Sequence, residues 1–210
     1  MSPSINLREG LVLTAPCAAG DGPLRSGADV SWLPRCRLGD NQGSNGACAV
    51  FSMASWAEIM HGRPISDAEC LAVYNAALKQ LDLSHGDGLT FGQAFAAAYE
   101  AGWLPGAQGC EMVFDLERLT QKPLLAGYAV TDAWTKPNGA GCVDHTAPDD
   151  ILGYHAVVIV AHGLLGAAPT ATGPWVYIEN SWGRAWGWNG VGVMSEALHR
   201  DMIRELWAIV

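Results

Sequence analysis

The sequence predicts an α+β protein in which a helical part comes first and a sheet or barrel part follows. Two patterns predict this class: apolar residues recur at helical spacing in the first half of the chain, and β-rich runs replace that spacing in the second half. Half of the 210 residues are hydrophobic, so the chain can bury a substantial core. Ligands commonly bind in a cleft between two such parts, and we expect the site there.

The chain divides at about residue 28. Residues 1–28 are rich in Gly, Pro, Ala and Ser and have little periodicity, which predicts an extended arm. Residues 29–210 are expected to form one domain, with the helical part at about 41–105 and the sheet part at about 106–210. The apolar run at 11–19 is short and is interrupted by Pro16 and Cys17, so we expect no secretion signal.

Helical spacing and capping residues define the expected helices. The first begins near Cys48, after the turn-forming residues Ser44 and Asn45. The second begins at Ser66, where a Glu three residues later completes a capping box. We expect helices at 47–60, from 66 onward and at about 90–102, with a short helical piece at 115–121.

The second half of the chain contains five runs rich in β-branched and aromatic residues, bounded by turn-forming residues. Runs of this length and composition predict strands. We expect strands at 124–130, 155–161, 175–179, 191–194 and 203–209.

Charge and cysteine spacing exclude several function classes. Twelve basic and 21 acidic residues give a net charge of −9, so we expect neither nucleic acid nor a membrane surface as a partner. No apolar run is long enough for a membrane span. The six cysteines include no C-x-x-C pair, which removes the usual zinc spacing. We therefore expect no metal and no cofactor.

Cys48 and Gln42 are candidates for nucleophilic catalysis. The N-terminus of a helix stabilises a thiolate, and the first expected helix begins near Cys48. Gln42 lies six residues upstream in a glycine-rich turn that could bring its amide beside the sulfur as an oxyanion donor. The same residues also fit a buried, unreactive cysteine and a solvated glutamine, which is the commoner arrangement for an arbitrary cysteine.

His155 and Asn180 are the candidate partners of Cys48. His155 opens an apolar strand, and a neutral imidazole there could accept the thiol proton. A lone histidine on such a strand is more often a core residue. Asn180 follows a strand at a turn, where Asn is common for backbone reasons alone.

Four segments of the sequence resemble the papain-like cysteine peptidases. The segment from Asn41 to Ser52 resembles the pattern N-Q-G-x-C-G-x-C-W-A-F-S, with the same interval from Gln to Cys. The segments 154–160 and 175–183 are similar to the family's His-Ala-Val strand and N-S-W-G segment, and 29–32 resembles its D-W dipeptide. The resemblance implies a two-lobed fold, with a helical N-terminal lobe, an antiparallel β-barrel-like C-terminal lobe and the active-site cleft between them.

The resemblance also implies a role for each matched residue. Cys48 would be the nucleophile and His155 the base. Asn180 would orient the imidazole, Trp182 would cover the histidine–asparagine bond, and Gln42 would complete the oxyanion hole. The segment 86–90 resembles the family's G-G-L segment, which places Asp87, Gly88 and Leu89 along a bound peptide or protein substrate.

Departures from the family pattern matter as well. Asn45 stands where the family usually has a disulfide-forming cysteine, Ala49 replaces a tryptophan, and no cysteine follows Cys142. These losses favour a reducing compartment or stability from packing alone. The arm of 28 residues is too short for the family's helical prodomain, so the arm itself or a regulatory partner is expected to control access.

The sequence therefore predicts a cysteine peptidase that acts through a Cys-His-Asn triad and a covalent thioester. An amidase or acyl-transfer enzyme would use the same triad, because an acyl-thioester can react with acceptors other than water. A catalytically silent binding module is a further alternative, but such a module has no need of all four candidate residues. Fold alone does not decide among these functions.

Overall fold

The computed structural model describes residues 24–26, 29–135, 137, 141–143, 151–163 and 174–210. Within these residues, eight strands form one sheet, and every paired strand is antiparallel to its neighbour. The strands are β1 (Leu24–Ser26), β2 (Asp29–Ser31), β3 (Cys110–Met112), β4 (Leu124–Val130), β5 (Gly153–Gly163), β6 (Trp175–Glu179), β7 (Val191–Ser195) and β8 (Ile203–Ile209).

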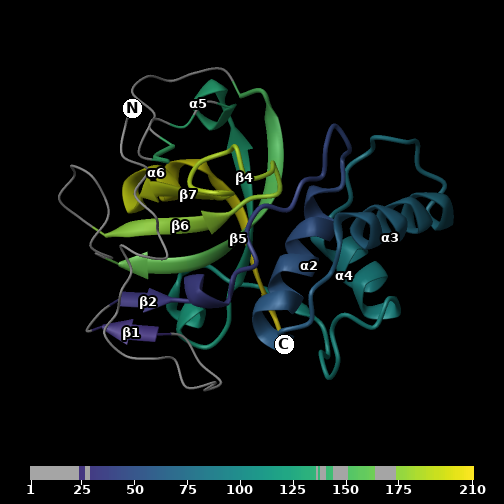
Figure 1. Ribbon diagram of the computed structural model, residues 1–210, viewed down its shortest axis with the longest axis horizontal. Helices are drawn as coiled ribbons and strands as arrows, with labels where there is room; N and C mark the ends of the chain where they lie inside the picture. Colours follow the sequence, from purple (N-terminus) through teal and green to yellow (C-terminus); the bar gives the residue numbers. More distant parts are fainter. Residues whose placement is uncertain (1–23, 27–28, 136, 138–140, 144–150, 164–173) are drawn as a thin grey trace.

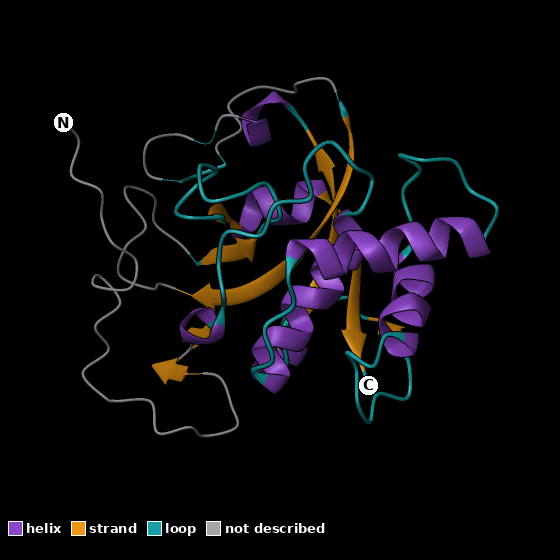
Figure 2. Ribbon diagram, turned by 45° about the vertical axis from the view of Figure 1, so that its right-hand side comes forward, coloured by secondary structure: helices purple, strands orange, loops and turns teal. Residues whose placement is uncertain are grey.

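The helices are α2 (Cys48–His61), α3 (Asp67–Gln80), α4 (Phe91–Glu100), α5 (Asp132–Thr135) and α6 (Glu196–Met202), with short 3-10 helices η1 (Leu33–Arg35) and η2 (Glu117–Thr120). The three longest, α2, α3 and α4, lie together beside the sheet in both views (Figure 1 and Figure 2). α2 packs against β4 and β5 and also against α3 and α4. It is buried on almost every side, from Ala49 to Ile59, because small Ala and Ser side chains alternate there with large apolar ones.

The sheet branches at its longest strand, β5. One edge of β5 pairs with β4 near its start and with β2 near its end, whereas the other edge pairs with β6. The path continues from β4 to β8 and β3 on one side and from β6 to β7 on the other. A barrel closes only when its terminal strands pair. β3 pairs with β8 alone and β7 with β6, so the expected barrel-like closure is wrong and the sheet is open.

Most of the predicted elements are confirmed. The three long helices and the five strands lie at the expected positions, apart from small shifts at their ends. The capping box is present: Ser66 Oγ accepts from the Glu69 N–H at 3.2 Å, and the Glu69 carboxylate accepts from the Ser66 N–H at 2.8 Å. The short helical piece is a 3-10 helix, η2.

The order of helices first and strands second is wrong. β1 lies inside the expected arm and pairs with β2, which itself pairs with β5, so two strands of the sheet precede the first α-helix. β3, α5 and α6 were not predicted from the sequence either. The rest of the arm, residues 1–23 and 27–28, lies outside the described residues. Where the chain is described, none of its helices has the length and apolar character needed to cross a membrane.

Candidate active site

Cys48 is the first residue of α2, so its thiol lies at the end of the helix where backbone N–H groups lack helical partners. The backbone N–H groups of Ala156 on β5, of Ala49 and of Cys48 itself act electrostatically on the sulfur. Burial raises the pKa of the thiol, and these three N–H groups lower it in part. α2 packs against β5, and the influence of Ala156 places the nucleophile candidate near the start of that strand.

His155 is the residue immediately before Ala156, and its side chain is buried. Its Nε2–H donates to Asn180 Oδ1 at 2.7 Å. The Ser181 N–H donates to the same oxygen at 2.8 Å, which fixes the orientation of the Asn180 amide. With Nε2 carrying the proton, Nδ1 of the neutral imidazole is an acceptor. The three candidates from separate segments therefore meet around β5.

Burial governs the charge states of both reacting groups. It lowers the pKa of His155 to about 4, although the bond to Asn180 raises it in part, and it raises the pKa of Cys48. Each group alone is thus neutral when buried. Opposite charges on a neighbouring thiolate and imidazolium would stabilise each other.

Trp182 covers the histidine. Its ring lies 4.5 Å from the His155 ring, centroid to centroid, with 33° between the planes. Trp134 meets His155 edge-on at 6.4 Å, and the Trp186 Nε1–H donates to the Trp134 carbonyl at 2.6 Å. These rings shield the bond between His155 and Asn180 from water, which holds the imidazole in one orientation.

Gln42 is buried and held at both ends of its amide. Ser181 Oγ donates to Gln42 Oε1 at 2.6 Å, and Gln42 Nε2 donates one hydrogen to the Asn45 carbonyl at 2.6 Å. The Gln42 N–H also donates to the Ser181 carbonyl at 2.9 Å. A primary amide has two N–H hydrogens. The second one is the group that an oxyanion would use.

With this geometry established, the chain can be compared with known proteins. No protein-family model matches it, and no curated protein does. Among solved structures, it is similar to xylellain, a cysteine protease from Xylella fastidiosa, with a TM-score of 0.64 and 17% sequence identity over 91% of this chain and 87% of that chain. The fold is similar to that of a cysteine protease. At this identity the likeness concerns the fold, and it does not select the papain family.

The turn between Gln42 and Cys48 is closed without a disulfide. Asn45 Nδ2 donates to the Gln42 carbonyl at 2.9 Å, which complements the bond from Gln42 Nε2 to Asn45. Gly43 has a φ of +64°, and its N–H donates to Asn41 Oδ1 at 2.9 Å. The Asn45 amide thus closes the turn at the position where the papain-like pattern has a cysteine. Cys36, Cys48, Cys70 and Cys110 are free thiols, and Cys17 lies outside the described residues.

The segment proposed to bind substrate lies beside this turn. The backbone approaches Gly46 closely here: a Cβ at Gly46 would collide with the Gly86 carbonyl oxygen and would lie 2.8 Å from the Asp87 carbonyl oxygen. The Asp87 carboxylate accepts from the Ser84 N–H at 2.8 Å, and Gly88 is exposed. Leu89 is buried in the core. The backbone of 86–88 is therefore near Cys48, while Asp87 also stabilises its own turn.

Two residues of the site were not found from the sequence. Ser181 anchors both Gln42 and Asn180, and Trp134 packs on His155. Ser181 lies within the N-S-W-G match, which was the available signal; Trp134 lies in a segment with no motif. Over the described part of the chain, no group of three His, Cys, Asp or Glu side chains has the geometry of a metal site.

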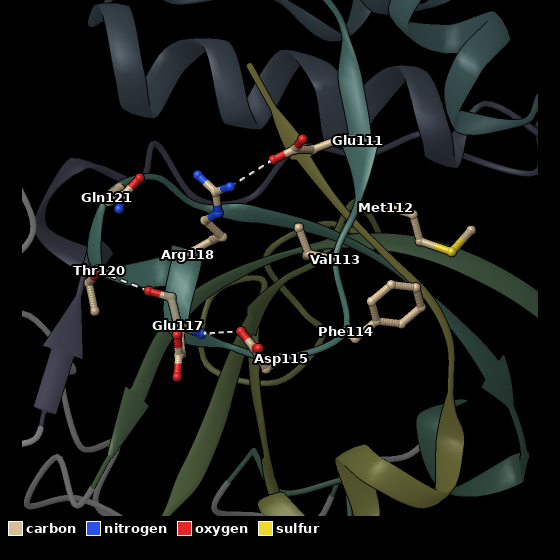
Figure 3. A pocket seen from close by; sticks show the side chains of 9 residues that line it. All are labelled: Glu111, Met112, Val113, Phe114, Asp115, Glu117, Arg118, Thr120 and Gln121. Atoms are coloured by element: carbon tan, nitrogen blue, oxygen red, sulfur yellow. Dashed lines mark hydrogen bonds and ion pairs between the residues drawn. The ribbon is translucent and has the colours of Figure 1, made fainter.

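A surface hollow of about 640 Å³ lies away from these residues, at β3 and η2 (Figure 3). Its walls include an exposed ion pair of 3.1 Å between Arg118 and Glu111, and the largely exposed Phe114. None of the candidate catalytic residues lines it. Since it holds no nucleophile beside a base, we assign no chemistry to this hollow.

Proposed function

We propose that this protein is a papain-like cysteine peptidase with a Cys48-His155-Asn180 triad and with Gln42 as an oxyanion donor. The observation that carries the proposal is the bond from His155 Nε2 to Asn180 Oδ1 beneath Trp182. The next residue on that strand, Ala156, has a backbone N–H that lowers the pKa of the Cys48 thiol. A core histidine needs no such arrangement. The similarity in fold to a cysteine protease supports the same conclusion.

The proposed reaction follows from the positions of these groups. His155 takes the proton of Cys48, and the sulfur attacks the carbonyl carbon of a peptide bond. The oxyanion accepts hydrogen bonds from the Cys48 N–H and from the second N–H of Gln42. His155 then gives its proton to the leaving amine as the C–N bond breaks, and water hydrolyses the thioester with His155 as base.

The finer architecture belongs to the same proposal. The helices α2–α4 would form one lobe and the sheet the other, with a peptide substrate lying between them. Its backbone would run along residues 86–88, where the carbonyl oxygens of Gly86 and Asp87 approach Gly46 in the turn before Cys48. Trp182, over His155, would border the far side of the scissile bond.

Labelling with an irreversible epoxide that alkylates papain-like thiols tests the proposal. At mildly acidic pH, mass mapping should find the label on Cys48 first, because only an ion-paired thiolate persists there. The matched control is Cys110, which is half-buried and whose pKa burial raises. Preferential labelling of Cys110 or Cys17 would exclude Cys48 as the activated thiol.

Turnover of short peptides separates the peptidase from its alternatives. Cys48→Ala should abolish hydrolysis, whereas Cys110→Ala should leave it unchanged. Cys48 labelling without peptide hydrolysis would favour an amidase or acyl-transfer enzyme, and neither labelling nor hydrolysis would favour a silent binding module.

A further inference from the structure

Three carboxyl groups are buried behind the candidate site. Asp40, Glu58 and Glu179 are only 5%, 5% and 4% exposed. Each has one carboxyl oxygen without a hydrogen-bond partner: Asp40 Oδ2, Glu58 Oε2 and Glu179 Oε2. Arg37 pairs with two of them: its Nη1 lies 2.8 Å from Glu58 Oε1 and 3.9 Å from Asp40 Oδ1. One arginine cannot neutralise three buried carboxylates.

The surroundings do not supply the missing positive charge. The carboxyls of Asp40 and Glu58 and the Cys36 thiol face Glu179, and Asp40 is further influenced by Asp67 and Arg184. Burial, together with the neighbouring carboxyls, raises the pKa of Glu179 to about 7 and that of Asp40 to about 6. No metal-site geometry occurs among the described residues. Protons on Glu179 and Asp40 reduce the negative charge of this cluster.

The cluster is connected to the residues that position the oxyanion donor. Glu179 directly precedes Asn180, and its Oε1 accepts from the Leu38 N–H at 3.1 Å. Leu38 has a φ of +65°, which is costly for a residue with a branched side chain, so this backbone needs the interaction.

From Leu38 the chain runs beside residues 180–183 as far as Gln42. The Gly183 N–H donates to the Asp40 carbonyl at 2.8 Å, and the Gln42 N–H donates to the Ser181 carbonyl at 2.9 Å. Asn41 and Trp182 form an antiparallel bridge between these two bonds. A displacement of residues 38–40 would therefore displace the Gln42 amide.

We propose that Glu179 is a positioning residue: its buried carboxyl, which accepts from the Leu38 N–H, holds residues 38–42 against 180–183 and so aims the Gln42 amide. When the cluster loses a proton at higher pH, repulsion between Asp40 and Glu179 separates the two segments, and the oxyanion donor moves out of place. The inference rests on the proposed function, because Gln42 contributes to turnover only in such an enzyme.

The pH profile of peptide turnover is the first test. Above neutral pH, wild-type kcat should fall more steeply than that of Glu179→Gln, with KM unchanged, because the lost contact forms in the transition state. The additional decrease of wild-type kcat, relative to Glu179→Gln, should level off at the roughly hundredfold decrease expected for removing one oxyanion donor. In a protein that already carries Gln42→Ala, adding Glu179→Gln should leave the pH dependence of kcat unchanged. Asp40→Asn changes a second carboxyl of the same cluster. Its kcat should also fall less steeply above neutral pH than that of the wild type.

Two controls isolate the cluster. Glu111→Gln alters an exposed carboxylate in the hollow of Figure 3 and should leave the profile as in the wild type. The rate of Cys48 alkylation reports on the thiol and His155 without the oxyanion, so its pH profile should be the same in wild type and Glu179→Gln. A parallel change in alkylation would show that Glu179 acts on the nucleophile and would overturn the inference.

Unfolding separates failure of the inference from failure of the proposed function. If the folded chain keeps Glu179 protonated, the melting temperature of Glu179→Gln relative to wild type should increase as pH rises from about 5 to about 8. A constant difference would overturn the inference even in an active peptidase. An increasing difference with unchanged turnover profiles would overturn the link to Gln42. Absence of turnover would overturn the proposed function and, with it, the role of Glu179 in turnover.

Discussion

At the scale of single residues, Ser181 holds the candidate site together. Its hydroxyl donates to Gln42 Oε1, and its N–H donates to Asn180 Oδ1, so it fixes the orientation of both amides. We expect Ser181→Ala to lower kcat with little change in KM, because Gln42 is needed in the transition state. The backbone bonds of Ser181 remain, so the loss should be smaller than the roughly hundredfold expected for Gln42→Ala. Steady-state kinetics of Ser181→Ala and Gln42→Ala show which loss of kcat is larger. Equal losses would show that the Ser181 hydroxyl alone orients the Gln42 amide.

The triad residues should differ in the size of their effects. Cys48→Ala and His155→Ala remove the nucleophile and the base, so turnover should be lost in both. Asn180→Ala should retain intermediate activity, because the rings of Trp182 and Trp134 still confine the imidazole. Single-turnover kinetics with a peptide ester measure acylation in each variant. A silent Asn180→Ala would assign the orienting role to these rings alone.

Asp87 provides a test of specificity. With a net charge of −9 and a carboxylate beside the expected substrate path, Lys or Arg near the third residue before the scissile bond should be preferred over acidic residues by a few-fold. The preference should weaken as salt rises. Peptide-library profiles of wild type and Asp87→Asn measure it. The same charge preference in both proteins would show that Asp87 stabilises the turn with Ser84 and does not contribute to specificity.

The sequence predicted residues that carry chemistry better than those that support them. Cys48, His155 and Asn180 could be found because their residue types and neighbours follow a pattern. Trp134 could not be found in this way. It contacts Trp182 and Trp186 only because α5 packs beside the residues that follow β6. The burial of Asp40 and Glu179 in one cluster could not be predicted for the same reason, because charged residues are expected to be exposed unless their partners are known.

At the scale of elements, the two helices after α2 are each capped at their N-termini. Ser66 Oγ accepts from the Glu69 N–H, and Thr90 Oγ1 accepts from the Gln93 N–H at 3.3 Å. Ser66→Ala and Thr90→Ala should each reduce the free energy of unfolding by about 1 kcal/mol. Urea unfolding measures the loss. Because Thr90 closely follows residues 86–88, only Thr90→Ala is expected to affect KM; the reverse would contradict the proposed substrate path.

Local signals explain why helices and strands were predicted but their assembly was not. The capping box and helical spacing are contained in short windows, and so is the apolar run of β4. The branch at β5 depends on Ser31 pairing with Ala161 while Leu124 pairs with Ile159 on the same edge. Such pairings join distant segments, and three-residue strands such as β1 and β3 are too short to show an alternating pattern.

At the scale of the whole molecule, buried titratable groups should oppose one another in their effect on stability. Burial lowers the pKa of His155 and of His199 to about 4, from 6.5, and the Tyr128 hydroxyl donates to His199 Nδ1 at 2.5 Å. The unfolded chain binds these protons first, so their contribution is lost as pH falls from about 6.5 to about 4. Glu179 and Asp40 have raised pKa values, so their contribution is lost as pH rises from about 4 toward 7.

These opposite slopes predict a nearly level stability between about pH 4.5 and 6, since each fully shifted group changes the free energy of unfolding by about 1.4 kcal/mol per pH unit. In single variants, one of the two opposing pH dependences of stability should become measurable. Glu179→Gln should make stability rise with pH in this window, whereas His199→Asn, which keeps an acceptor for Tyr128, should make it fall. Urea unfolding at several pH values measures all three proteins. Parallel profiles would show that these groups titrate alike in the folded and unfolded chain, and a steep wild-type profile would show that one set of buried groups dominates.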